Sequence, residues 1–143
     1  MMTRKKRQIT VPPEKAVVLI VDDMQSMRMI TRTTLKEMGF RKFVESPNGQ
    51  EALKRLKLMN IDLVICDWDM PEMNGIELLR QIRADQRLRK VSFVMLTAHA
   101  EADLIHESIT VGVDGYLVKP YQPSTLCARI NDLLEHPVDI SYA

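Results

Sequence analysis

Carboxylates, a hydroxyl and an amine follow four apolar runs of this sequence, and they are its strongest candidates for chemistry. Each stands directly after the last residue of a run: Asp22 and Asp23 after 16–21, Asp67 after 63–66, Thr97 after 91–96, and Lys119 after 116–118. If the runs are parallel strands of one sheet, their carboxyl ends meet at one edge, where ligands bind in folds of this kind. The spacing therefore predicts a single polar site.

The types of these residues predict phosphoryl chemistry. Clustered carboxylates repel one another less when they hold a divalent cation, and oxygen ligands favour Mg²⁺ or Mn²⁺ over zinc. Lys119 supplies a compact positive charge and Thr97 a small donor for phosphoryl oxygens. One carboxylate can then act as a nucleophile and form an acyl phosphate, because phosphoryl transfer depends mainly on positioning and charge neutralisation. The pattern indicates a phosphoryl-accepting site.

The elements that must position these side chains alternate along the chain. The four apolar runs are rich in β-branched residues and lack the alternation of a half-exposed strand, which is typical of strands buried on both faces; a weaker run is Phe43–Val44. Stripes of helical period lie between and after them, at 27–38, 48–56, 76–82, 104–111 and 123–134. Five strand–helix units predict an α/β fold, a doubly wound parallel sheet with right-handed crossovers.

Length and composition fit one globular domain. The chain has 143 residues, 45% of them apolar and 27% charged, which allows one sizeable core and an ordinary soluble surface. No apolar run is long enough to span a bilayer, and the charged N-terminus lacks the apolar segment of a secretory signal. We therefore expect a cytoplasmic protein that does not contact the membrane.

Cysteine, histidine and charge patterns add little chemistry. Cys66 and Cys127 lie in apolar surroundings without metal-type spacing, which predicts reduced core residues and no structural zinc.

Residues 1–15 carry five Lys/Arg and one Glu, a charge of +4, so with a net charge of +1 the remainder carries −3. We interpret the basic run Arg4–Arg7 as part of a solvated tail; contact with nucleic acid or anionic lipid is the alternative.

Longer segments around the same residues resemble a known family. The chain is similar to the receiver domain of two-component response regulators, particularly the stand-alone chemotaxis regulators of the CheY type. The segments that carry the resemblance are Val-Leu-Ile-Val-Asp22-Asp23 with Ser26-Met27-Arg28, Asp67-Trp68-Asp69-Met70-Pro71 with Asn74-Gly75, Leu96-Thr97-Ala98, and Gly115-Tyr116-Leu117-Val118-Lys119-Pro120. The resemblance implies a receiver domain over 16–135, with a basic tail at 1–15 and a short tail at 136–143. It also implies a flavodoxin-like sheet of order 2-1-3-4-5, for which CheY is a standard example.

The resemblance also implies a role for each site residue. Asp67 would accept the phosphoryl group of a histidine kinase's phosphohistidine. Asp23, Asp67 and the backbone carbonyl of Asp69 would bind Mg²⁺, with Asp22 assisting directly or through water. Thr97 and Lys119 would hold phosphoryl oxygens. Tyr116 stands at the position of the family's switch aromatic, which moves inward as Thr97 moves towards the phosphate, and the Lys119–Pro120 bond would be cis.

Two positions depart from the chemotaxis relatives. Asp69 stands where they often carry Asn, and His99 where they often carry Glu; in this family the two positions tune hydrolysis of the acyl phosphate. Our hypothesis is that Asp69 strengthens cation binding and that His99, whose charge can vary near neutral pH, approaches the phosphoryl group. The alternative is that both side chains point into solvent and change little.

The signal would be a change in binding. No DNA-binding or other effector domain follows residue 134, so phosphorylation is expected to switch the face formed by the fourth helix, fifth strand and fifth helix, about residues 101–134. The implied partners are a sensor histidine kinase and a downstream protein, such as a flagellar motor switch or a phosphotransfer protein. The chain itself would be a monomer or a weak, phosphorylation-dependent dimer through that face. Four methionines near the site are a further candidate docking surface: Met24, Met27, Met70 and Met73.

Three alternatives stay open. Within the receiver class, the chain could be a phosphate carrier in a multistep phosphorelay, or an interaction module that works without phosphorylation. Outside it, Asp67-Trp68-Asp69 resembles the Asp-x-Asp of haloacid-dehalogenase-type phosphatases, although Pro71 stands where that family has Thr or Val. A receiver would only accept and lose its own phosphoryl group, whereas the phosphatase would be an enzyme.

Overall fold

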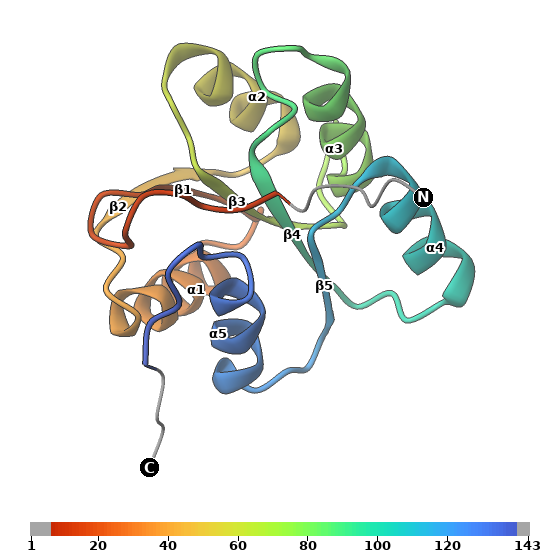
Figure 1. Ribbon diagram of the computed structural model, residues 1–143. Helices are drawn as coiled ribbons and strands as arrows, with labels where there is room; N and C mark the ends of the chain where they lie inside the picture. The colour runs from red at the N-terminus through yellow and green to blue at the C-terminus, as the bar shows by residue number, and fades with distance from the viewer. Residues whose placement is uncertain (1–6, 140–143) are drawn as a thin grey trace, which may run out of the picture.

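Strands and helices alternate along the part of the chain that the computed structural model describes, residues 7–139 (Figure 1). In chain order they are β1 (Val17–Val21), α1 (Gln25–Glu37), β2 (Lys42–Ser46), α2 (Gly49–Leu58), β3 (Leu63–Asp67), α3 (Gly75–Ala84), β4 (Ser92–Thr97), α4 (Ala102–Val111), β5 (Gly115–Val118) and α5 (Pro123–Asn131). The predicted strand–helix alternation is confirmed, and the weak run Phe43–Val44 lies within β2.

The strands form one parallel five-stranded sheet of order β2-β1-β3-β4-β5, so the predicted order is confirmed. In its register, Val21 pairs with Ser46 on one side and Cys66 on the other, and Asp67 pairs with Leu96. The carboxyl ends of the central strands are therefore level, which brings the residues that follow them to one edge.

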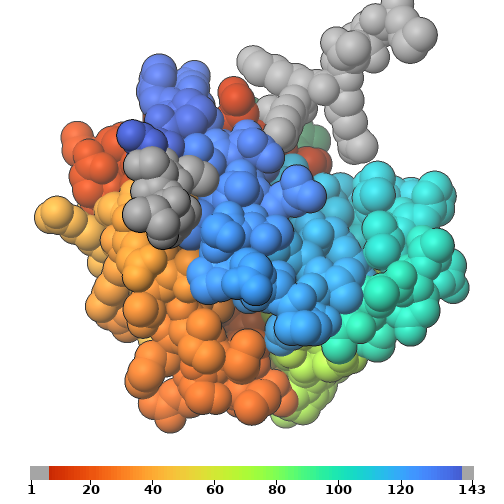
Figure 2. Space-filling view, turned by 90° about the horizontal axis from the view of Figure 1, so that it is seen from below, coloured from red at the N-terminus to blue at the C-terminus, as the bar shows by residue number. Residues whose placement is uncertain are grey.

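Two helical layers cover the sheet. Helices α1 and α5 lie on one face, α2 and α3 on the other, and α4 lies beside β5 (Figure 1). Alternate residues of β1 point to opposite faces: Val18 and Ile20 enter the core on the α1–α5 side, Leu19 and Val21 the core on the α2–α3 side. The space-filling view shows the α1–α5 side of the molecule, with α1 in orange beside α5 in blue (Figure 2). Burial on both faces explains why the strand sequences are continuously apolar.

Local signals fix several helix ends. Asn48 accepts a hydrogen bond from the Glu51 N–H at the start of α2, which confirms the predicted capping pair. Gly39 and Gly112 follow α1 and α4 with φ of 100° and 114°, a left-handed conformation that glycine adopts without a Cβ clash. Pro123 is the first residue of α5, as predicted.

Two predicted helix stripes are partly wrong. Ile30 is 54% exposed, and the buried residues of α1 are Thr31, Thr34 and Leu35. Ile109 is likewise 57% exposed on α4. A helix sequence with apolar residues on overlapping faces fits more than one stripe, and the sheet selects the face that packs best.

The packed chain begins before the predicted domain boundary at residue 16. Ile9 is 3% exposed, its N–H donates to the Leu133 carbonyl, and the Glu135 N–H donates to the Ile9 carbonyl. At the other end, the Asn131 side chain hydrogen-bonds to the backbone of Val138, inside the predicted tail 136–143. Residues 4–6 of the basic run lie outside the described residues. Isolated apolar residues such as Ile9 give no periodic signal, so the sequence did not predict this packing.

Both cysteines are buried and reduced, as predicted. Among residues 7–139, no helix combines the length and apolar character needed to cross a bilayer.

Candidate functional site

Three carboxylates meet at the carboxyl edge of the sheet. Asp22 and Asp23 follow β1, and Asp67 is the last residue of β3. One oxygen of each lies within 4.8 Å of the others, which confirms the predicted cluster. Carboxylates this close are destabilised by mutual repulsion unless a cation is present, so the donor set fits a hard divalent cation such as Mg²⁺.

Burial increases the cost of charge in this cluster. Asp22 is 6% exposed, and its carboxylate accepts the Met24 N–H at 2.9 Å. Burial raises the pKa of the Asp22 carboxyl, and the charge of Asp67 raises this pKa further. Burial is also the main cause that raises the pKa of Asp67, against the lowering effect of Lys119. The site therefore attracts positive charge.

Lys119 supplies the positive charge on the other side of the cluster. Its Nζ lies 3.5 Å from Asp67 Oδ1 and 3.8 Å from Asp22 Oδ2. The Lys119 N–H donates to the Thr97 carbonyl at 2.7 Å, which ties the ends of β4 and β5 together. The Lys119–Pro120 bond is cis, as predicted. The ammonium is thus placed beside the carboxylate that is the expected acceptor.

Thr97 and Tyr116 are linked through the backbone of His99. Thr97 is fully buried at the end of β4, and its hydroxyl accepts the His99 N–H at 3.0 Å. The Tyr116 hydroxyl, from β5, donates to the His99 carbonyl at 2.8 Å. Burial raises the pKa of Tyr116, which keeps this hydroxyl a donor at neutral pH. A movement of Thr97 would therefore move the backbone of His99, to which the Tyr116 hydroxyl is hydrogen-bonded.

Asp69 and His99 contact each other, which the sequence did not predict. His99 Nε2 lies 2.9 Å from Asp69 Oδ1, and the Trp68 ring packs edge-on against the imidazole with centroids 5.6 Å apart. The hydrogen bond to Asp69 is the main cause that raises the pKa of His99. The two departures from the chemotaxis relatives thus contact each other between the loops after β3 and β4, with the Asp69 side chain 62% exposed and that of His99 30% exposed.

Gly75 supports the site, and its only signal in the sequence is the Asn74-Gly75 segment of the family resemblance. A Cβ at Gly75 would lie 2.6 Å from the Asp67 carbonyl oxygen and 2.7 Å from Met95 Sδ. The first turn of α3 therefore packs directly on the backbone of Asp67. Arg28 is a second missed residue: its guanidinium donates to the Asp22 carbonyl at 2.6 Å and pairs with Glu45 at 3.0 Å.

The four methionines do not form one surface. Met24 is 56% exposed, and Met27 lines a groove between α1 and α5. Met70 and Met73 are partly buried and pack against the α2–α3 core. The methionine docking surface is therefore reduced to the α1 side of the site.

The parallel order 2-1-3-4-5, with acidic, hydroxyl and amine side chains after four strands, defines a flavodoxin-like α/β protein with an acidic cluster at one edge of its sheet. The model of the response regulator receiver domain matches residues 18–131, and the chain belongs to this family. Receiver domains are signalling proteins rather than classical enzymes, and they typically bind Mg²⁺ at an acidic cluster such as the one formed by Asp22, Asp23 and Asp67.

Individual relatives place the chain near the CheY group. The chemotaxis protein CheY of Pseudomonas aeruginosa is 42% identical over 118 residues, 82% of this chain and 95% of that protein. CheY-3 of Vibrio cholerae is also 42% identical over 118 residues, 82% of this chain and 91% of that protein. Among solved structures, Vibrio cholerae CheY4 has a TM-score of 0.76 at 33% identity, covering 83% of this chain and 98% of its own.

A different setting is represented by the receiver domain of a signal transduction histidine kinase from Syntrophus aciditrophicus. It has a TM-score of 0.77 at 29% identity and covers 90% of this chain and 98% of its own. The chain is therefore a CheY-like receiver of two-component signalling, and chemotaxis proteins are among its relatives at 42% identity.

Proposed function

We propose that Asp67 accepts a phosphoryl group from the phosphohistidine of a sensor kinase. The observation that carries this proposal is the Asp67 carboxylate itself, 3.5 Å from the Lys119 ammonium and clustered with Asp22 and Asp23. An Asp67 oxygen attacks phosphorus, the P–N bond breaks, and the imidazole leaves with the bonding electron pair. Lys119 and the Thr97 hydroxyl then hold the phosphoryl oxygens.

Mg²⁺ fits the donor set and would be held by Asp23, Asp67 and the Asp69 carbonyl, with Asp22 assisting. Bound there, it would neutralise charge on the carboxylates and the incoming phosphoryl group. Mn²⁺ can substitute, because it prefers the same oxygen ligands.

The output is a changed binding face. The phosphoryl group draws Thr97 towards it, and the hydrogen bond between Tyr116 and the His99 carbonyl supports a coupled inward movement of the tyrosine. This biases a pre-existing equilibrium of the α4–β5–α5 face, through which the chain binds a downstream protein or a second copy of itself. Asp69 and His99 tune the lifetime of the acyl phosphate.

The face beside the acceptor suits the phosphate donor. A groove of about 460 Å³ between α1 and α5 is lined by Met27, Ile30, Lys119, Pro120 and Leu126, among other residues. Lys119 belongs both to this groove and to the site, so a kinase domain seated here would present its phosphohistidine to Asp67. The reaction takes place in the cytoplasm, where such kinases present their histidine domains.

Two roles follow for the phosphorylated chain. Similarity to the chemotaxis proteins favours control of a flagellar motor. Similarity to a receiver of a histidine kinase favours the phosphate carrier, which passes the group to another histidine. Family membership favours both over the haloacid-dehalogenase-like phosphatase.

The test is a titration with beryllofluoride and Mg²⁺ that follows Trp68 fluorescence. Trp68 neighbours Asp67 and is 7% exposed, so its emission reports changes at the site. We expect a saturable change that needs Mg²⁺ in wild type and is absent in D67N. An unresponsive wild type would refute the proposal and favour an interaction module that works without phosphate.

A further inference from the structure

A second groove, of about 720 Å³, opens at the end of the sheet opposite Asp67. One wall is the N-terminal segment 8–10; the other walls are the end of α2 with the α2–β3 connection, 56–62, and the α3–β4 connection, 85–91. These connections precede β3 and β4, whereas Asp67 ends β3. The groove is therefore separate from the phosphoacceptor site.

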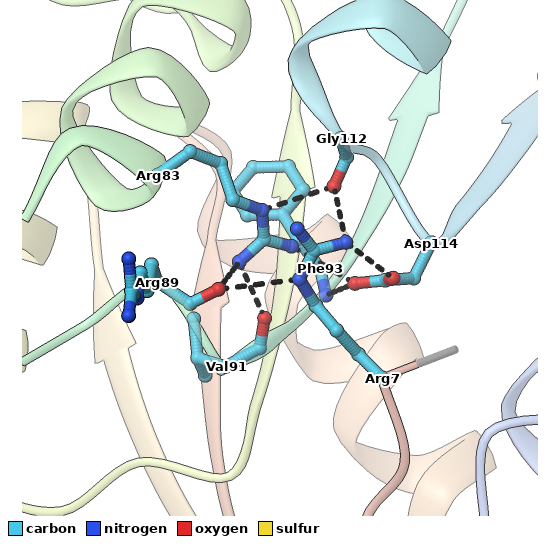
Figure 3. Close-up of polar contacts among 7 residues, drawn as sticks. All are labelled: Arg7, Arg83, Arg89, Val91, Phe93, Gly112 and Asp114. Atoms are coloured by element: carbon cyan, nitrogen blue, oxygen red, sulfur yellow. Dashed lines mark hydrogen bonds and ion pairs between the residues drawn. The ribbon is translucent and has the colours of Figure 1, made fainter. Parts of the chain in front are cut away.

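The segment that forms the first wall, which we call the N-terminal strap (residues 7–11), is anchored to the rest of the protein at Ile9 and at Arg7. Ile9 is buried and hydrogen-bonded to the backbone of Leu133 and Glu135. Arg7 reaches Asp114 at 3.3 Å and the Arg89 carbonyl at 3.2 Å, beside the Arg83–Asp114 ion pair of 2.9 Å (Figure 3). The strap is thus a fixed wall.

The strap presents an open backbone edge. The N–H and carbonyl of Ile9 are hydrogen-bonded to the backbone of Leu133 and Glu135. In an extended segment the N–H and carbonyl groups of the two neighbouring residues point to the opposite side. Within the described residues, the N–H and carbonyl groups of Gln8 and Thr10 make no hydrogen bond. Such an edge is a template for an added strand.

The rest of the groove combines apolar surface with a small net positive charge, because its lining holds three basic and two acidic residues. Leu58 is 82% exposed and Met59 41% exposed, next to the apolar lining residues Ile61, Leu88 and Val91. Three basic side chains also line it, without an ion pair to another residue of 7–139: Lys57, Arg87 and Lys90. The acidic lining residues are engaged locally, since Asp62 accepts the Val17 N–H and Asp85 accepts the Arg87 N–H.

We propose that this groove binds an extended acidic segment of a partner protein. The segment pairs with the open edge of Gln8 and Thr10, places an apolar side chain against Leu58 and Leu88, and sets its carboxylates against Lys57 and Lys90. Because the groove lies at the far end of the sheet from Asp67, binding does not depend on phosphorylation. The chain would then hold this partner in both phosphorylation states, in addition to the partner that binds the α4–β5–α5 face on phosphorylation.

The geometry favours a peptide over other anionic partners. Bases of a nucleic acid stack on aromatic side chains, and the lining residues include none. A membrane surface cannot use the free N–H and carbonyl groups of Gln8 and Thr10, nor reach Val91, which is 8% exposed. An extended peptide matches the edge, the apolar floor and the charge together.

The test is selection of binding peptides from a random displayed library on the full chain. We expect enriched sequences with Asp or Glu on both sides of a large apolar residue. The best peptide should bind K57E/K90E at least tenfold more weakly, and bind K36E/K42E, a matched charge reversal at exposed lysines of α1 and β2, within twofold of wild type. N-methylation at alternate peptide residues should abolish binding in one register and leave the other unchanged. Beryllofluoride with Mg²⁺ should leave the affinity within twofold.

Several results would overturn the proposal: no enrichment, enrichment without acidic residues, or equal affinity for K57E/K90E. Competition of the peptide by phosphatidylserine vesicles or a single-stranded oligonucleotide, at lower concentration than the peptide itself, would assign the groove to lipid or nucleic acid instead. None of these results depends on phosphorylation of Asp67, so failure here leaves the proposed function standing.

Discussion

Asp67→Asn should stabilise the metal-free protein. At an effective dielectric constant of about 20, two carboxylates at the 4.8 Å upper limit of their separation repel by roughly 3.5 kcal/mol, and the Lys119–Asp67 pair at 3.5 Å attracts by about 5 kcal/mol. The substitution removes the repulsions with Asp22, the more exposed Asp23 and Asp69. It also removes the attraction to Lys119 and weakens the hydrogen bonds that the Asp69 and Trp68 N–H groups donate to the carboxylate. The net gain is about 1–2 kcal/mol, or roughly 2–8 °C in melting temperature for a chain of this size.

The assay is thermal unfolding in EDTA and again in excess Mg²⁺. In EDTA the variant should melt above wild type. In Mg²⁺ wild type should gain stability, about 2.7 kcal/mol at a hundredfold excess over Kd, while D67N gains little. E14Q, a change at an exposed carboxylate before β1, should match wild type in both conditions. A variant that melts below wild type in EDTA would contradict this prediction, because the attraction to Lys119 would then exceed the repulsion among the carboxylates.

The same site gives metal-free stability a pH dependence. Burial raises the pKa of Asp67 and Asp22 above their ordinary values, so the folded state holds protons more tightly than the unfolded state. Stability from these groups is present at low pH and is lost as the pH rises through the raised pKa values. As the pH is lowered in EDTA from neutrality towards the ordinary carboxyl range, wild type should therefore gain more stability than D67N, as urea titrations can measure. Equal slopes for the two proteins would contradict the assigned shifts.

Three further predictions concern packing and phosphate lifetime. D114A removes the carboxylate that pairs with the buried Arg83 guanidinium and accepts the Phe93 N–H, so it should lower the free energy of unfolding in urea by about 3–5 kcal/mol. R7A, at the more exposed arginine, should lower it by about 1 kcal/mol or less. Equal costs would contradict the different burial of the two arginines. G75A should cost about 1–3 kcal/mol and slow labelling of Asp67 by acetyl phosphate, and unchanged labelling would show that the acceptor tolerates the shift. D69N and H99E should each change the decay of the acyl phosphate more than twofold, and together by less than the product of the single effects, because the two side chains bond each other; rates within twofold of wild type for both would refute the tuning role.

Much of the fold is present in local sequence patterns. Strands buried on both faces must be continuously apolar, so 16–21, 63–66 and 91–96 predict a parallel sheet between helical layers without any tertiary information. Asn48 and Gly39 also predicted helix ends without tertiary information, because a capping residue acts within one helical turn of its own position. The candidate site could also be predicted, because parallel strands of similar length must bring Asp23 and Asp67 to one edge.

Tertiary structure decided what depends on contacts between segments far apart in sequence. Asp69 and His99 are thirty residues apart, and only the meeting of two loops joins them. Ile9 is a single apolar residue without periodicity, so its burial beside Leu134 follows from the space left at the end of α5. Packing against the sheet determined which face of α1 is buried: Leu35 is inside and Ile30 is outside. The sequence of an amphipathic helix predicts its apolar face only to within one neighbouring row of side chains.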